Sequence, residues 1–105
     1  MKAVIIHAHG GLEALKYEDI KRPTPGPEEA LVAVKACALN RLDIWVRAGI
    51  PGRKIGLPRI PGSDIAGEVA EVGVGVKEKP GDPVVVHAVL SCGKCDFCRD
   101  GRDNL

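Results

Sequence analysis

The sequence predicts a mainly β fold with one short helix and a cysteine-rich lobe near its end. Thirteen Gly and eight Pro make up a fifth of the 105 residues, against roughly 12% in average proteins, and this favours many turns and short strands. Short apolar runs rich in β-branched residues alternate with these turns, as is typical of strands. A chain of this length, 45% hydrophobic, fits one compact domain.

Five apolar runs are predicted to be strands. They are residues 2–7, 15–20, 30–35, 65–72 and 84–87. Gly67 inside the fourth run indicates a bend or a close backbone approach. We expect the last run, which is rich in Val, to be a buried strand. The Pro-rich segment 22–27 is predicted to be an extended connector, because Pro fixes φ and removes backbone donors.

The predicted helix begins after Asn40 and ends before Gly49. Asn40 is a good N-cap residue, Asp43 follows it by three positions, and Pro51 stands just beyond the glycine. We expect the bulky Trp45 to pack in the core.

The charge balance argues against nucleic-acid and membrane partners. Fifteen Lys and Arg residues face fourteen Asp and Glu residues, for a net charge of +1, without the basic excess that drives binding to nucleic acid or anionic lipid. No apolar run approaches the roughly 18 residues of a membrane span, and the start of the chain lacks a signal-peptide pattern. We therefore expect a cytoplasmic protein. The absence of Gln, with only two Asn and one Met, is typical of a heat-adapted source.

Three of the four cysteines, Cys92, Cys95 and Cys98, lie within seven residues. This layout is poor for disulfides, but two overlapping C-x2-C steps can bring thiolates to one metal ion. A ferredoxin-type cluster would need another Cys where Arg102 stands, so zinc is favoured over iron–sulfur. The remaining cysteine, Cys37, ends a predicted strand, and we expect it to be a packed core thiol.

Together these features resemble the zinc-type medium-chain dehydrogenase/reductases, which include alcohol dehydrogenases and quinone reductases. The matching segments, in the family's order, are 62–67, 73–76, 80–82 before a valine run, and 92–98. In that family four cysteines spaced C-x2-C-x2-C-x7-C hold a structural zinc. Cys92, Cys95 and Cys98 match the first three, and the fourth would fall at position 106, one residue past the end. The resemblance thus implies one structural zinc whose fourth ligand is missing in this chain.

The same resemblance implies the N-terminal part of a GroES-like β-barrel catalytic domain over residues 1–105. The Rossmann domain that binds NAD(P) in such enzymes is absent from the chain. We therefore expect a fragment of a longer oxidoreductase, inactive alone, whose full-length form is a homo-oligomer with a nicotinamide cofactor and a small-molecule substrate.

The resemblance also locates a catalytic site whose zinc pattern is altered. Alcohol dehydrogenases carry a zinc-binding Cys where this chain has Asn40, and a zinc-binding His where it has Ser63. Amide and hydroxyl oxygens are poor zinc ligands beside thiolate and imidazole. A stable catalytic zinc is therefore not expected. The sequence instead resembles the zinc-independent quinone and enone reductases, in which hydrogen bonds orient the substrate carbonyl while the cofactor delivers hydride. The residues that carry this resemblance are Asn40, Asp43, Trp45, Arg47 and Gly49.

The candidate catalytic residues are Asn40, Asp43, Ser63 and Asp64, and Asn40 would also contact the cofactor. Structural alternatives are a helix cap for Asn40, an interaction with the helix N-terminus for Asp43, and a turn role for Asp64. Two other functions stay open: an alcohol dehydrogenase whose catalytic zinc is rebuilt from Asp64, His87 and residues beyond the end, and a non-enzymatic zinc-binding interaction module.

The three histidines are expected to be structural or exposed. His7 and His87 each end a predicted strand and are interpreted as satisfied structural residues, although His87 could also face the pocket. His9 is expected to be exposed.

Overall fold

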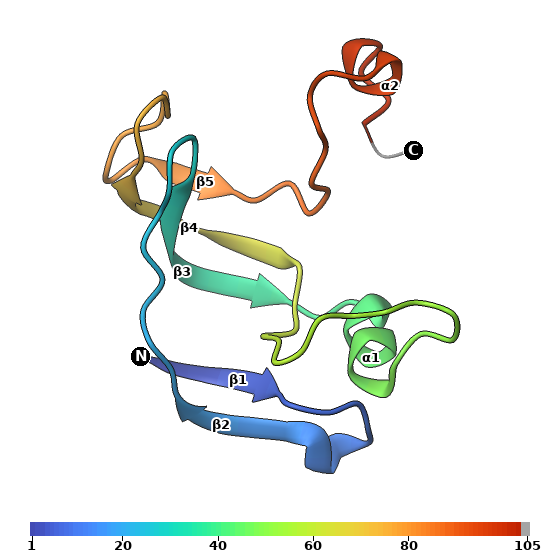
Figure 1. Cartoon of the computed structure of the whole chain (residues 1–105). Helices are drawn as coiled ribbons and strands as arrows, with labels where there is room; N and C mark the ends of the chain where they lie inside the picture. The colour runs from blue at the N-terminus through green and yellow to red at the C-terminus, as the bar shows by residue number, and fades with distance from the viewer. Residues whose placement is uncertain (104–105) are drawn as a thin grey trace.

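The fold consists of two separate antiparallel sheets and two short helices, shown by a computed structural model that describes residues 1–103. A two-stranded sheet holds β1 (Lys2–Ile6) and β2 (Leu15–Asp19). A three-stranded sheet has the order β3 (Ala30–Ala38), β4 (Asp64–Val72) and β5 (Pro83–Val85). Figure 1 shows the two sheets side by side, joined by the segment that runs from β2 to β3. The mainly β prediction is confirmed.

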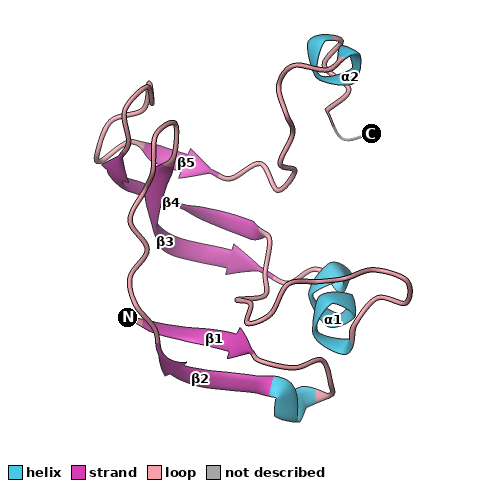
Figure 2. Cartoon of the chain, in the orientation of Figure 1, coloured by secondary structure: helices cyan, strands magenta, loops and turns pink. Residues whose placement is uncertain are grey.

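Helix α1 (Arg41–Ala48) directly follows β3, as the sequence predicts. Two shorter helical pieces were not predicted: a 3-10 turn at Leu12–Ala14 and α2 (Asp96–Arg99) within the cysteine segment. Figure 2 shows how much of the remaining chain is loop, in keeping with its content of Gly and Pro. No helix in the described part of the chain is long and apolar enough to cross a membrane.

The register of β3 against β4 is interrupted where Gly67 lies. Gly67 pairs with Val34, and the register shifts between Val34 and Ala36. A Cβ atom placed on Gly67 would lie 2.3 Å from the carbonyl oxygen of Ala33, closer than real Cβ contacts allow. The close backbone approach predicted at Gly67 is confirmed, and beyond it the strands run on until Ala38 pairs with Asp64.

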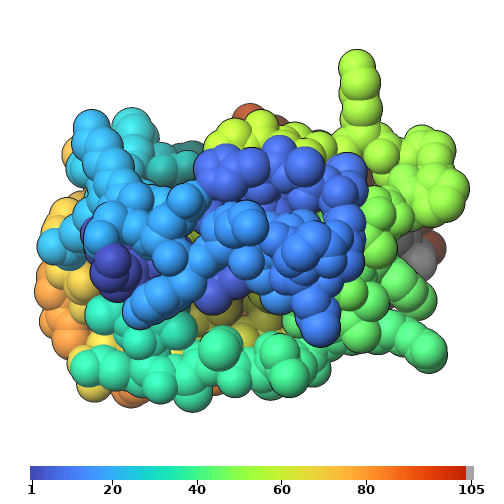
Figure 3. All heavy atoms as spheres, turned by 90° about the horizontal axis from the view of Figure 1, so that it is seen from below, coloured from blue at the N-terminus to red at the C-terminus, as the bar shows by residue number. Residues whose placement is uncertain are grey.

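The loop that follows α1 joins the helix region to the first sheet. Ile6 and Arg59 exchange backbone hydrogen bonds of 2.9 Å, and the N–H of Gly10 donates to the carbonyl oxygen of Arg47 at 3.0 Å. Seen from below, the hairpin (blue) covers the centre of the face with the post-helix segment (yellow-green) beside it (Figure 3). The hairpin therefore fixes the position of α1.

The buried core is small. Within residues 1–103, the buried apolar side chains are Ile5, Ile6 and Val69. The prediction of a buried strand over 84–87 is wrong: β5 ends at Val85, whose side chain is 82% exposed. Within the described part of the chain β5 pairs with β4 alone and forms the edge of its sheet, so no described strand lies on its other side.

Two further burial predictions are also wrong. Cys37 is exposed although it lies in β3, and Trp45 is 53% exposed on α1. Cys37 is expected in the core because it ends a predicted strand, and Trp45 because of its bulk. Within residues 1–103 the fold leaves both side chains open to solvent.

Candidate functional site

Asn40 lies between β3 and α1, and its side chain caps the helix. Its Oδ1 accepts a hydrogen bond from the backbone N–H of Leu42 at 3.1 Å. Its backbone N–H donates in turn to Oδ2 of Asp43 at 2.8 Å, which completes a capping box. The helix-cap interpretation of Asn40 is confirmed. Asp43 lies in the first turn of α1, where its carboxylate holds the backbone of Asn40.

Asp64 opens β4, and the strand register carries it to Asn40. Since Ala38 pairs with Asp64, the residues just after β3 lie beside the start of β4. The side-chain amide of Asn40 donates from Nδ2 to Oδ2 of Asp64 at 3.4 Å across 24 positions of sequence. Asp64 is thus a strand residue, and the turn interpretation is wrong. Ser63, half-buried, directly precedes it.

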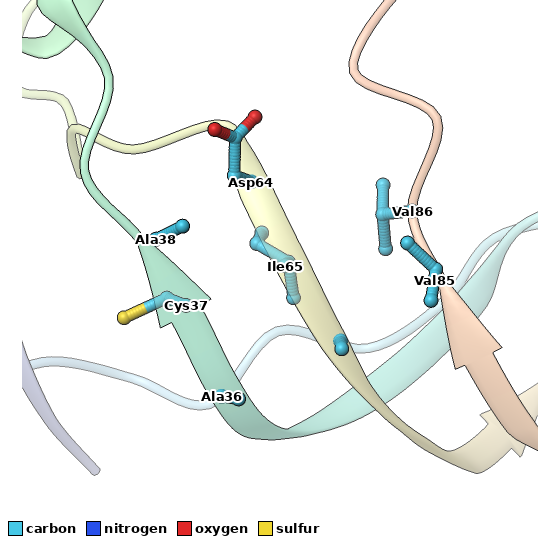
Figure 4. Close-up of a pocket in the computed structure, with 8 residues that line it drawn as sticks. Ala36, Cys37, Ala38, Asp64, Ile65, Val85 and Val86 are labelled. Atoms are coloured by element: carbon cyan, nitrogen blue, oxygen red, sulfur yellow. The ribbon is translucent and has the colours of Figure 1, made fainter.

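A cavity of about 360 Å3 adjoins this pair. Its lining comes from three strand ends: Ala36, Cys37, Ala38, Asp64, Ile65, Ala66, Val85 and Val86. In Figure 4 the carboxylate of Asp64 stands at one end of the cavity, and Val85 and Val86 face Ile65 across it. The sulfur of Cys37 points away from those two valines. Among the lining residues Asp64 carries the only charge.

Of the predicted site residues Asp64 lines this cavity, whereas Asn40, Asp43 and Ser63 are not among its lining residues. Sequence reasoning missed the apolar wall. Ile65, Val85 and Val86 were assigned only to strands. Alternation along each strand could have indicated which side chains share a face, but not that the two strand ends lie side by side.

The second candidate site is the cysteine cluster, in which three sulfur atoms converge around Cys98. The Sγ of Cys98 lies 3.4 Å from that of Cys95 and 3.8 Å from that of Cys92. All three sulfurs lie within 4.8 Å of one another. Cys95 precedes the first residue of α2 and Cys98 lies inside it, so one short helix sets two of the three positions.

Backbone donors favour the thiolate form of Cys92. The backbone N–H groups of Lys94 and Cys95 lower the pKa of the Cys92 thiol to about 7, and Lys94 contributes most. The N–H of Cys95 lies 3.4 Å from Sγ of Cys92. Hydrogen bonds to the charged form stabilise it. A thiolate is the form that binds metal, so the electrostatics of the loop suit a cation.

The spacing of the three sulfurs fits zinc. Zn–S bonds of ~2.3 Å at tetrahedral angles place sulfur atoms ~3.8 Å apart, and the separations of 3.4 Å and 3.8 Å are close to this value. Cys92, Cys95 and Cys98 can therefore hold a zinc ion. Position 106, where the resemblance expects the fourth cysteine, lies outside the described residues.

His87 and Asp103 link the cysteine lobe (residues 91–105, described as far as 103) to the end of β5. The Nε2 of His87 lies 3.4 Å from Oδ2 of Asp103. Within residues 1–103, the cysteine cluster is the one group of three or more Cys, His, Asp or Glu side chains that converges enough for a metal ion. The described chain thus supplies no third donor to Asp64 and His87.

The other two histidines, His7 and His9, each have a polar neighbour in the structure. His7 contacts the carboxylate of Glu18 on the neighbouring strand, in agreement with its structural interpretation. His9 is exposed as predicted, and its Nδ1 lies 3.1 Å from the carbonyl oxygen of Val46 in the last turn of α1.

Comparison with known proteins identifies the family. Residues 26–105 match the model of the alcohol dehydrogenase GroES-like domain. The quinone oxidoreductase of Rattus norvegicus is 38% identical over 99 residues, which cover 92% of this chain and 30% of the rat protein. The chain thus spans about a third of the length of its curated relatives.

Solved structures agree. A crystal structure of an NAD-dependent alcohol dehydrogenase is 48% identical with a TM-score of 0.92, over all of this chain and 31% of the other. A cobalt- and zinc-bound thermostable alcohol dehydrogenase from Pyrobaculum aerophilum is 43% identical with a TM-score of 0.89, over 99% of this chain and 31% of the other. The chain therefore belongs to the alcohol dehydrogenase GroES-like domain family of the medium-chain dehydrogenase/reductases.

Proposed function

We propose that residues 1–105 are the N-terminal part of the catalytic domain of a longer NAD(P)-dependent oxidoreductase that works without catalytic zinc. The enzyme transfers hydride between a nicotinamide cofactor and a carbonyl, alcohol or enone substrate. The observation that carries the proposal is the hydrogen bond from Asn40 to Asp64 beside a cavity with otherwise apolar walls. Relatives that include an NAD-dependent alcohol dehydrogenase and a quinone oxidoreductase support the reaction class.

Within this proposal the polar residues position the substrate. As the family resemblance implies, Asn40 and Ser63 would line the substrate and nicotinamide pocket of the whole enzyme. Asp43 holds Asn40 through the capping box. Hydrogen bonds from a fixed scaffold orient the reacting carbon, which is a large part of catalysis when no metal polarises the substrate. When bound, the nicotinamide supplies or accepts the hydride.

Zinc has a structural role in the proposed enzyme. Cys92, Cys95 and Cys98 hold one ion, and by the family resemblance a fourth cysteine at position 106 closes the site. A closed four-ligand site contributes directly to folding. We further propose that the full-length protein is a cytoplasmic homo-oligomer.

The experiment uses the longer protein that contains this chain. Oxidation of NAD(P)H is followed with a quinone and with an enone, reduction of NAD(P)+ is followed with an alcohol, and metal is measured by mass spectrometry. We expect turnover with at least one class and close to one zinc per chain. Two zincs per chain would support the rebuilt catalytic zinc instead, and no turnover with all three classes would contradict the proposal. Residues 1–105 alone should show no turnover.

A substitution tests the role of Asn40 separately from its role as a helix cap. Asn40→Ser keeps a side-chain oxygen that caps the helix but removes the amide donor. We expect turnover to fall at least tenfold while the melting temperature stays within a few degrees. Unchanged turnover would remove Asn40 from the reaction.

A further inference from the structure

We propose that a second copy of this chain pairs with the free edge of β2, strand against antiparallel strand, about a two-fold axis at Tyr17. This inference rests on the homo-oligomer of the proposed function, for which it names the surface between two copies. Its basis is the set of backbone groups and charges that β2 leaves without a partner in the described part of the chain.

β2 forms one edge of the two-stranded sheet. Within the described residues β1 is its only neighbouring strand, and Figure 1 shows β2 on the side of that sheet that faces away from β3, β4 and β5. Figure 3 looks onto the same hairpin, and no other segment covers it in that view. A strand edge of this kind is a template for pairing with another chain.

The backbone groups of Tyr17 point away from β1. Met1 and Ile20 exchange backbone hydrogen bonds of 2.7 Å and 2.8 Å, and hydrogen-bonded and non-hydrogen-bonded pairs alternate along an antiparallel ladder. Tyr17 lies three positions before Ile20, so it falls in a non-hydrogen-bonded pair and its N–H and C=O face the free edge. The same alternation explains why Ile6 of β1 bonds outward, to Arg59.

The charges of β2 select one register for a symmetric pair. In a pairing centred on Tyr17, Lys16 of one copy lies opposite Glu18 of the other, and the two-fold axis repeats this pair. A centre at Lys16 or at Glu18 would place like charges opposite each other, which is destabilising. A centre at either end of the strand leaves most of β2 unpaired. The register centred on Tyr17 therefore fits best.

Both charged side chains have capacity left for this contact. In the described part of the chain Lys16 has no ion-pair partner. Glu18 contacts Nε2 of His7 through Oε1. A carboxylate has two acceptor oxygens, so Oε2 of Glu18 can accept from Lys16 of the second copy. A lysine on a strand edge usually opposes association, whereas this register neutralises it.

The face that carries Tyr17 gains an apolar contact from the same register. Tyr17 is 73% exposed, and Val4 and Leu15 on the same face of the hairpin are exposed as well. The two-fold axis brings the Tyr17 rings of two copies side by side, and such cross-strand aromatic pairs stabilise sheets. The N–H and C=O of Tyr17 bond to the same groups of the second copy, which continues the ladder across the axis.

The test is a disulfide in the longer protein, loaded with zinc and carrying Cys37→Ser. Opposed residues of a hydrogen-bonded antiparallel pair have Cα atoms about 5.5 Å apart, a distance that a disulfide spans, so Tyr17→Cys should link two copies. Asp19→Cys is the matched control. It is similarly exposed on the same face, but in this register the two copies of residue 19 lie ~14 Å apart along the strands. Brief oxidation with diamide and non-reducing electrophoresis measure the rate of cross-linking, and we expect Tyr17→Cys to link at least tenfold faster.

Charge variants in the Tyr17→Cys background test the register. Lys16→Glu places a carboxylate opposite Glu18 of the second copy, and we expect the rate of cross-linking to fall at least tenfold. Adding Glu18→Lys to that variant restores opposite charges and should recover most of the rate. Lys77→Glu makes the same charge change at an exposed residue between β4 and β5, and it should leave the rate unchanged. Melting temperature verifies that each variant folds.

Three results would overturn the inference. The first is cross-linking of Tyr17→Cys no faster than that of Asp19→Cys. The second is a charge-swapped double variant that cross-links as slowly as Lys16→Glu alone, because pairing would then not follow this register. Either result leaves the proposed function intact where sedimentation velocity shows an oligomer that turns over substrate. The third is a monomer at every protein concentration tested, which overturns the proposed homo-oligomer as well.

Discussion

In the cysteine lobe three sulfur atoms meet within seven residues of sequence, whereas Asn40 and Asp64 meet across 24 positions because β3 and β4 pair. The first site is assembled by a local loop and the four-residue α2. The second site depends on the register of β3 against β4 and on helix α1, which follows β3. The two sites should therefore respond to different substitutions.

The two regions are also physically separate. Figure 1 shows α2 apart from both sheets, joined to β5 by an extended segment. The contact between His87 and Asp103 joins the start of that segment to the lobe, and both side chains are partly exposed. Exposed ion pairs contribute little to stability, so a change in either region should leave the other largely intact.

Removing a sulfur from the lobe should have the largest effect. The Sγ of Cys98 lies within 3.8 Å of both other sulfurs, and Cys98→Ser removes one of the four thiolates that the proposed zinc site needs. We expect zinc affinity in the longer protein to fall at least a hundredfold, because structural zinc binding is strong and cooperative with folding. Competition with a chromogenic chelator measures it. Cys37→Ser is the control and should keep full zinc content, and an equal loss in both variants would contradict the assignment.

Blocking the close approach of β3 to β4 should perturb the other region. In Gly67→Ala the new Cβ would lie 2.3 Å from the Ala33 carbonyl oxygen, so the strands must separate. Overpacking of this kind costs about 1–3 kcal/mol, and we expect the free energy of unfolding to fall by that amount in denaturant titrations. Gly56→Ala is the matched control, since nothing lies within 4 Å of its Cβ position.

The same pair of variants separates the two sites. Gly67→Ala should retain zinc, because the lobe does not depend on the β3–β4 register. Loss of zinc in Gly67→Ala with full zinc in Gly56→Ala would show that the two regions are coupled.

Sequence reasoning succeeded where the cause of a feature is local. The spacing of Cys92, Cys95 and Cys98 predicted that their sulfurs converge, and Asn40 with Asp43 predicted a helix cap. In both cases the partners lie close together in the sequence. Gly67 was also interpreted correctly, because a glycine inside a strand often marks a bend or a close backbone approach.

Sequence reasoning failed where the burial of a side chain depends on partners that are distant in the sequence. Cys37, Trp45 and the run 84–87 were expected inside because their residue types are usually buried. Whether a strand face is covered depends on which other elements pack against it, and residue type carries no information on that. The contact from Asn40 to Asp64 was likewise beyond sequence reasoning alone, since it needs the register that pairs Ala38 with Asp64.

Removing the helix cap should have a moderate effect on stability. Asn40→Ala loses the hydrogen bond from the Leu42 N–H and the contact with Asp64. Loss of an N-cap side chain costs ~1 kcal/mol, and we expect this decrease in the free energy of unfolding, with zinc content unchanged. Asn40→Ser, which keeps a capping oxygen, should recover most of the loss. Equal destabilisation by Ala and Ser would assign the effect to the contact with Asp64 instead of the cap.

The reactivity of Cys92 should show the smallest effect, and it depends on pH. Backbone N–H groups of Lys94 and Cys95 lower the thiol pKa to about 7, against ~8.5 for a free cysteine. In the zinc-stripped protein the thiolate therefore forms as pH rises through about 7 and is lost below it. At pH 7 the thiolate fraction is about fifteenfold higher than for an ordinary thiol, but the lower basicity reduces nucleophilicity about fivefold. The net gain in alkylation rate is about threefold.

This gain is measured by iodoacetamide labelling and peptide mass spectrometry between pH 5 and 10. The labelling rate of Cys92 should level off just above pH 7. In Cys92→Ser the fast component at pH 7 should disappear, because no other cysteine of the lobe receives the same pair of backbone donors. A rate for Cys92 that keeps rising to pH 8.5 or beyond would show that the loop does not stabilise the thiolate, and that the lobe is not arranged for a cation before the metal binds.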